Sequence, residues 1–167
     1  MHSMERHNKI LKQQERQHAA NLLKKHDLVC KQLPFGDDCS PLYLAKPHWT
    51  NRFDSKREST IGIFCSLWVS PKLLEQGQFA YNIHSKSIRK LPGYKLTSKE
   101  FASEFRSLVK SSVSQWPGIR LDCGPTTLLE GRETSELGSF ADNVEERILG
   151  FAGICQHIDD LLEKSIN

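Results

Sequence analysis

The stretch TIGIFCSLWVSPKLLEQGQFAYNIHSKSIRKLPGYKL, from Thr60 to Leu96, decides the fold class of this 167-residue chain. Residues 61–69 are rich in β-branched and aromatic types, and both faces are partly apolar, which predicts a central strand covered on both sides. Residues 79–86 alternate apolar with polar side chains, as a strand with one buried face does. The connection between them is too long for a tight hairpin, and it predicts one helical turn that starts at a proline and ends at Gly77.

Two amphipathic helices are predicted to pack against this sheet. The first begins with a capping box formed by Thr97 and Glu100, and apolar residues then recur at helical spacing. The second covers residues 142–164 and has its apolar residues along one side. Because Gly150 and Gly153 lie inside it and lower its helix propensity, we expect its backbone to pack closely against another element.

The rest of the chain predicts shorter or less regular elements. Residues 6–28 are expected to form a helix whose first half is polar nearly all round, so that it projects into solvent or meets a partner. The proline- and glycine-punctuated segment that follows is expected to be an ordered loop with a short strand near residues 48–53. Further strands are expected at residues 119–123 and 126–130, followed by a polar loop that begins at Arg132.

These elements together predict an α+β fold. The expected architecture is a small, mainly antiparallel sheet of three or four strands, packed by amphipathic helices, with a long N-terminal helix. The expected division is an N-terminal helical arm over residues 1–32 and a single α+β domain over residues 33–167. A chain of this length can bury a core without disulfides or metals to staple it.

Composition is typical of a soluble globular protein, with 38% hydrophobic and 26% charged residues. No apolar run approaches the roughly 18 residues of a membrane span, and the polar first residues lack a secretory signal. We therefore expect a cytoplasmic protein with no membrane partner. The five cysteines are widely spaced, which favours reduced thiols over a disulfide framework. The histidines of the N-terminal helix lack zinc-site spacing, and neither a metal nor a cofactor is expected.

The net charge of +3 conceals a strong asymmetry along the chain. Residues 1–120 carry 20 Lys and Arg against 10 Asp and Glu, whereas residues 121–167 carry 3 against 10. Such a division indicates either a basic surface for an anionic partner or two faces that pair with each other in a homodimer.

A set of basic residues around the central strands is the candidate binding surface. Lysine and arginine neutralise phosphates, and neighbouring aromatic rings such as Trp49 and Tyr94 can stack on bases. The sequence pI of 8.6 is modest for a dedicated nucleic-acid domain, so a plain solvated face is the competing interpretation. The candidate binding residues are Arg52, Lys56, Arg57, Lys86, Arg89 and Lys90.

His84, Asp122 and Glu130 are the candidate catalytic residues. A histidine on one strand could activate Cys123 on another, but Asp122 and Cys123 point to opposite faces of their predicted strand and cannot easily serve one site. Asp122 and Glu130 flank a turn and could instead hold a metal for phosphodiester cleavage. Their spacing matches no established signature, and the chain has no Gly-rich phosphate loop, H-E-x-x-H or dinucleotide fingerprint.

The leading functional hypothesis is a non-catalytic binding domain that contacts nucleic acid or an acidic partner through its basic surface. One alternative is a small hydrolase or nuclease-like enzyme that uses His84, Asp122 and Glu130. The other is a homodimeric interaction protein in which the basic body of one copy meets the acidic C-terminal helix of the next.

Overall fold

The computed structural model describes residues 21, 23–32, 41–52 and 61–166. Its strands form one antiparallel sheet in the order β1-β2-β3-β4-β5, with each strand next to its sequence neighbour. The strands are β1 (Val29–Gln32), β2 (Leu42–Ala45), β3 (Gly62–Trp68), β4 (Gln78–Lys86) and β5 (Thr127–Thr134). The helices are α2 (Pro71–Glu75), α3 (Ser98–Val113) and α4 (Phe140–Lys164), with single 3-10 turns η1 (Pro47–Trp49), η3 (Ile88–Lys90) and η4 (Leu137–Ser139). None of these described helices is long and apolar enough to cross a membrane.

The predicted α+β class and antiparallel sheet are confirmed, and so are the elements around the two central strands. Ser70 caps α2, which ends before Gly77 with a φ of +63°. The capping box of α3 is present: the Thr97 amide donates to the Glu100 carboxylate over 2.7 Å, and the Glu100 amide donates to the Thr97 hydroxyl over 3.1 Å.

The prediction of three or four strands is wrong, because β1 and β2 add to the sheet and bring it to five. These two strands have four residues each, which is too short for a clear alternation in the sequence. They are stabilised by pairing with their neighbours in the sheet. β1 lies within the segment predicted as an N-terminal arm. The predicted N-terminal helix falls mainly outside the described residues. Within its described part, residues 21 and 23–25 are helical and residues 26–27 form a turn. The long helix of the described chain is the C-terminal α4.

Predictions for the C-terminal half of the sheet are also wrong in part. Residues 119–123 form no strand and contribute a single bridge, from Arg120 to Glu130. β5 does not end at Gly131 and continues through the residues predicted as loop. The reason is steric: Gly131 lies opposite Tyr81, and a Cβ there would be 2.2 Å from the Tyr81 hydroxyl oxygen. The short strand expected near residues 48–53 is η1, followed by a single bridge from Thr50 to Gly62.

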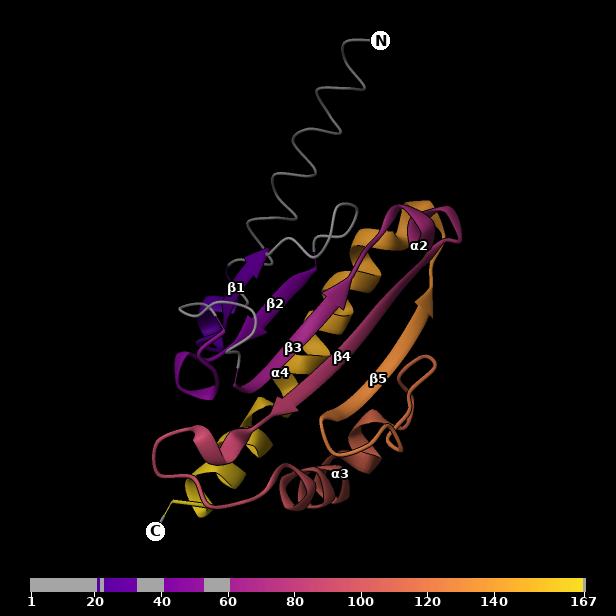
Figure 1. Cartoon of the computed structure of the whole chain (residues 1–167). Coiled ribbons are helices and arrows are strands. Elements are labelled where there is room, and N and C mark those ends of the chain that lie inside the picture. The colour runs from indigo at the N-terminus through magenta and orange to yellow at the C-terminus, as the bar shows by residue number, and fades with distance from the viewer. Residues whose placement is uncertain (1–20, 22, 33–40, 53–60, 167) are drawn as a thin grey trace.

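Side chains alternate between two different faces of the sheet. Phe79, Tyr81 and Ile83 of β4 are fully buried on the face covered by α4, which runs behind the sheet and contacts α3 (Figure 1). The opposite face, called the outer face below, carries the polar side chains of β4 and the residues that pair with them. These are Tyr43, Phe64, Ser66, Trp68, Ala80, Asn82, His84, Lys86, Glu130 and Arg132.

The helix-covered face contains an ion pair inside the core. Arg147 of α4 lies 3.4 Å from the Glu133 carboxylate of β5, and the two side chains are only 4% and 7% exposed. The guanidinium also lies over two aromatic rings, 4.4 Å from the centroid of Trp116 and 5.0 Å from that of Tyr81. Close packing at Gly150 is confirmed, since a Cβ there would be 2.9 Å from the Trp116 ring. At Gly153 no atom of the described residues lies within 4 Å of such a Cβ.

Asp159 ties α4 to the other end of the sheet. Its carboxylate accepts hydrogen bonds from Trp49 Nε1 at 2.7 Å, from His48 at 3.0 Å and from Lys46. Burial alone would raise the pKa of Asp159, but these hydrogen bonds outweigh burial and hold the pKa below its ordinary value. The carboxylate therefore stays ionised and keeps α4 docked on η1.

Breaking the buried ion pair from one side is expected to destabilise the fold strongly. Arg147→Met should lower the free energy of unfolding by about 3–5 kcal/mol, because it leaves the Glu133 carboxylate buried without its cation. Arg147→Met/Glu133→Leu should recover most of that loss, because an apolar pair of similar volume replaces both charges. Urea unfolding followed by circular dichroism measures both values.

Lys164→Met is the matched control, since Lys164 lies on the same helix and forms an exposed ion pair with Glu104 at 3.3 Å. Its removal should cost less than about 1 kcal/mol. Additive destabilisation in the Arg147/Glu133 double variant would show that the two side chains act independently.

Candidate binding site on the outer face

One row of paired residues crosses the outer face from edge to edge. Strand register places Ser66 directly opposite Asn82, and Asn82 directly opposite Glu130. Beyond β5, the backbone of Arg120 exchanges hydrogen bonds of 2.8 and 3.1 Å with that of Glu130. Since directly paired residues of an antiparallel sheet point to the same side, the whole row lies on one face. The row reads Lys31, Tyr43, Ser66, Asn82, Glu130, Arg120.

The β2–β3 half of this face is buried. Tyr43 and Phe64 are 2% and 6% exposed. The Arg52 guanidinium lies over both rings, 4.0 Å from the centroid of Tyr43 and 5.2 Å from that of Phe64. Arg52, predicted as a binding residue, therefore also has a packing role as a cation on an aromatic pair.

The β4–β5 half is accessible and contains a pocket of about 500 Å³. Among its lining residues, the Glu130 carboxylate is 3.5 Å from Nη1 of Arg120, and these side chains are 40% and 61% exposed. An ion pair so exposed to solvent is weak and can be exchanged for a ligand. Arg132 is exposed at the rim and forms no ion pair with the described residues. The pocket is lined by Ala80, Tyr81, Asn82, Gly118, Arg120, Glu130, Gly131 and Arg132.

Two polar atoms of the row lack partners in the described part of the chain. The Oδ1 atom of Asn82 and the hydroxyl of Ser66 are buried and accept or donate no hydrogen bond there. Most buried polar atoms in proteins are hydrogen-bonded, so exceptions need a reason. Asn82 also lines the pocket, but this oxygen lies below the surface and is out of reach of a group bound there.

His84 lies on the same face as Asn82, one alternation along β4. Its ring is 5.2 Å from that of Phe64, centroid to centroid. Burial lowers the pKa of His84 below 6.5, and the nearby Arg52 lowers it further, while a backbone hydrogen bond at Thr126 and the Glu130 carboxylate act in the opposite direction. His84 is therefore neutral at pH 7, and it lies within the electrostatic reach of Glu130.

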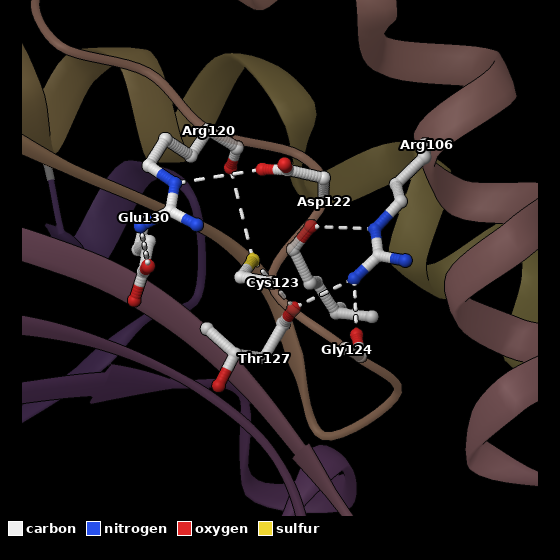
Figure 2. Close-up of polar contacts among 8 residues, drawn as sticks. Arg106, Arg120, Asp122, Cys123, Gly124, Thr127 and Glu130 are labelled. Carbon is white, nitrogen blue, oxygen red and sulfur yellow. Dashed lines mark hydrogen bonds and ion pairs between the residues drawn. The ribbon is translucent and has the colours of Figure 1, made fainter.

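Arg120 joins the two candidate catalytic carboxylates. Its guanidinium lies beside Asp122 and Glu130 (Figure 2). The nitrogen-to-oxygen distances are 3.4 Å to Asp122 and 3.5 Å to Glu130. Asp122 is 83% exposed on the loop before β5. A cation that contacts both carboxylates competes with any metal they would share, and the described residues contain no cluster of three metal-ligating side chains. The catalytic roles of His84, Asp122 and Glu130 stay a prediction.

Arg106 of α3 holds the loop that precedes β5. Its guanidinium donates to the backbone oxygens of Leu128 at 3.1 Å, of Thr127 at 2.8 Å and of Gly124 (Figure 2). The thiol of Cys123 points at the Thr127 carbonyl, 3.0 Å away, and burial raises its pKa, so it is not an activated nucleophile. These hydrogen bonds hold the loop in place, and its Arg106 and Cys123 contacts are structural.

The other predicted binding residues divide into two groups. Lys86, Arg89 and Lys90 are exposed at the end of β4 and in η3. Lys56 and Arg57 lie outside the described residues. Sequence reasoning missed Arg120 and Arg132; extending the alternation of β5 past Gly131 would have placed Arg132 on the same face as Glu130.

No family model matches this chain, and no curated protein or solved structure is significantly similar to it. The chemistry of the outer face is therefore the guide to function.

Electrostatic coupling on the outer face can be measured through His84. Arg52→Gln should raise the pKa of His84 because it removes a nearby positive charge, and Glu130→Gln should lower it because it removes a negative one. Imidazole proton shifts followed by NMR across pH 4–8 report both directions. Because folding lowers this pKa, His84 contributes stability that is present above its unfolded pKa and is lost as pH falls through the folded value.

Lys164→Gln, on α4, serves as a control that should leave the titration of His84 unchanged. An identical pKa in the wild type, Arg52→Gln and Glu130→Gln would show that these side chains do not sense one another.

Proposed function

We propose that this protein is a non-catalytic binding domain that contacts single-stranded nucleic acid through its outer face. The observation that carries the proposal is the gathering of cations from separate segments on one side of the sheet. Lys31, Lys86, Arg120 and Arg132 belong to this face, and Arg89 and Lys90 follow directly at the end of β4. Cations spread over a surface neutralise successive phosphates of a strand.

The charge of the opposite side of the molecule also favours binding of a polyanion at the outer face. α4, which covers the other face of the sheet, carries six carboxylates against two cations. The negative charge of the last part of the sequence is therefore concentrated on α4. Such a distribution steers a polyanion to the outer face and away from the helices.

The shape of the surface favours a single strand over a duplex. The accessible part of the outer face is the β4–β5 half, where the surface is hollowed by the pocket. A flexible single strand can turn an unstacked base into such a pocket, whereas the bases of a duplex stay paired and stacked. A single strand can also lie across a sheet, with its phosphates near cations and its bases against the protein. The pocket beside Asn82 and Glu130 offers room for a group that leaves the strand.

Binding to a mixed-sequence 12-nucleotide RNA should weaken steeply with salt. In Lys86→Gln/Arg132→Gln the slope of log K against log salt should become shallower by about 0.7 for each phosphate that the variant no longer neutralises. Both side chains are exposed, so the fold should be unaffected. Fluorescence anisotropy of labelled RNA between 25 and 200 mM NaCl measures the slope.

The matched control is Lys72→Gln/Lys164→Gln, which changes the net charge equally at exposed sites on α2 and α4. It should leave the slope unchanged. Failure of the wild type to bind RNA or heparin at 25 mM NaCl would overturn the proposal. A sedimentation mass near twice 19.1 kDa that Lys86→Gln/Arg132→Gln lowers would favour the homodimer instead.

A further inference from the structure

We infer that the pocket between β4, β5 and residues 118–120 is a base-selective subsite that takes guanine. This inference rests on the proposed function, because it names the base that the site would select from a bound strand. The relevant side chains are those of Glu130, Arg120 and Arg132, residues that line one pocket of about 500 Å³. Ligand pockets in proteins commonly have volumes of about 300–1,000 Å³.

The acceptors of the pocket define which edge of a base fits. A carboxylate offers two oxygens side by side, and the Glu130 side chain that carries it is 40% exposed. Guanine presents N1–H and the N2 amino group next to each other, so it can give both hydrogen bonds to one carboxylate. Adenine and cytosine present one amino group beside an acceptor nitrogen, which would face a carboxylate oxygen and repel it.

The donors of the pocket complement the remaining edge of the same base. Guanine carries O6 and N7, a pair of acceptors that arginine recognises through two hydrogen bonds. Arg132 is exposed and has no ion pair with the described residues, so it can contact a base without first breaking an ion pair. The ion pair between Arg120 and Glu130 is 3.5 Å long and exposed to solvent, so it is weak. Arg120 can therefore turn to a base or phosphate once a base is hydrogen-bonded to the Glu130 carboxylate.

The walls of the pocket are fixed by the fold. Tyr81 donates its hydroxyl proton to the Pro117 carbonyl over 2.6 Å, and Arg120 and Glu130 are joined by two backbone hydrogen bonds. Gly118, with a φ of +61°, approaches β5 so closely that a Cβ would be 2.7 Å from the Arg132 carbonyl oxygen. The backbone that carries Glu130, Arg120 and Arg132 is thus held in place before a ligand binds, which lowers the entropic cost of binding.

The test compares 12-nucleotide RNAs that are all uridine except for one central base. The strand with guanosine should bind roughly tenfold or more tightly than those with adenosine or cytidine, in line with one bidentate base contact. Inosine, which lacks only the N2 amino group, should lose much of this preference. In Glu130→Gln the preference should disappear, while binding of the all-uridine strand should be retained or improved because a negative charge has been removed.

Glu136→Gln is the matched control, an exposed carboxylate just after β5 that should leave the guanosine preference intact. Equal affinity for all four central bases, with salt-dependent binding retained, would overturn the guanine site and leave the proposed function standing. Equal affinity for the strands with central inosine and central guanosine would also overturn the guanine site. This comparison uses only the wild-type protein, so it does not depend on the folding of a variant.

A second arm separates a free nucleotide from a strand. Amide resonances of residues 80–82 and 130–132 should shift on addition of guanosine monophosphate and not of cytidine monophosphate. Shifts with guanosine monophosphate but no binding of any RNA would support the guanine pocket and overturn the strand-binding function. Absence of both shifts and RNA binding would overturn both proposals.

Discussion

The hydrogen bond from the Tyr81 hydroxyl to the Pro117 carbonyl, 2.6 Å long, connects the core of this protein to its surface pocket. The Tyr81 ring packs in the core against Trp116 and Phe151, and its hydroxyl reaches across β5 at Gly131, where any larger residue would collide with it. Burial, opposed by Arg147, raises the pKa of Tyr81 to about 12, so the donor is permanently protonated. The bond fixes the segment that carries Arg120 beside Glu130.

Two ion pairs of the same chemistry have opposite consequences because of their surroundings. Arg147–Glu133 and Arg120–Glu130 are separated by 3.4 and 3.5 Å, and both carboxylates belong to β5. The first is almost completely buried and stacked on aromatic rings, so removing either partner exposes the other charge to an apolar core. The second faces solvent, contributes little to stability and can exchange partners. The alternation of β5 therefore separates a structural charge from one available for binding.

Local patterns predicted much of the fold and little of the site. The two central strands, the capping box at Thr97 and the amphipathic α3 followed from alternation and spacing in the sequence. The end of β5 did not, because Gly131 is required by Tyr81 on the neighbouring strand rather than by a turn. Placing Arg132 in a loop followed from that error and removed it from the candidate surface. The predicted contact of Arg52 with a ligand overlooked its stacking on Tyr43 and Phe64, two aromatic side chains from different strands.

The sequence by itself determined the two central strands, the helices α3 and α4, which side chains share a face within these elements, and that positive charge is concentrated before residue 121. Only the tertiary structure decided that Ser66, Asn82, Glu130 and Arg120 form one row. The periodicity of a strand is a local property of its backbone and can be read from consecutive residues. Register depends on contacts between distant segments. A shift of one strand by one residue would move its outer-face side chains to the core face.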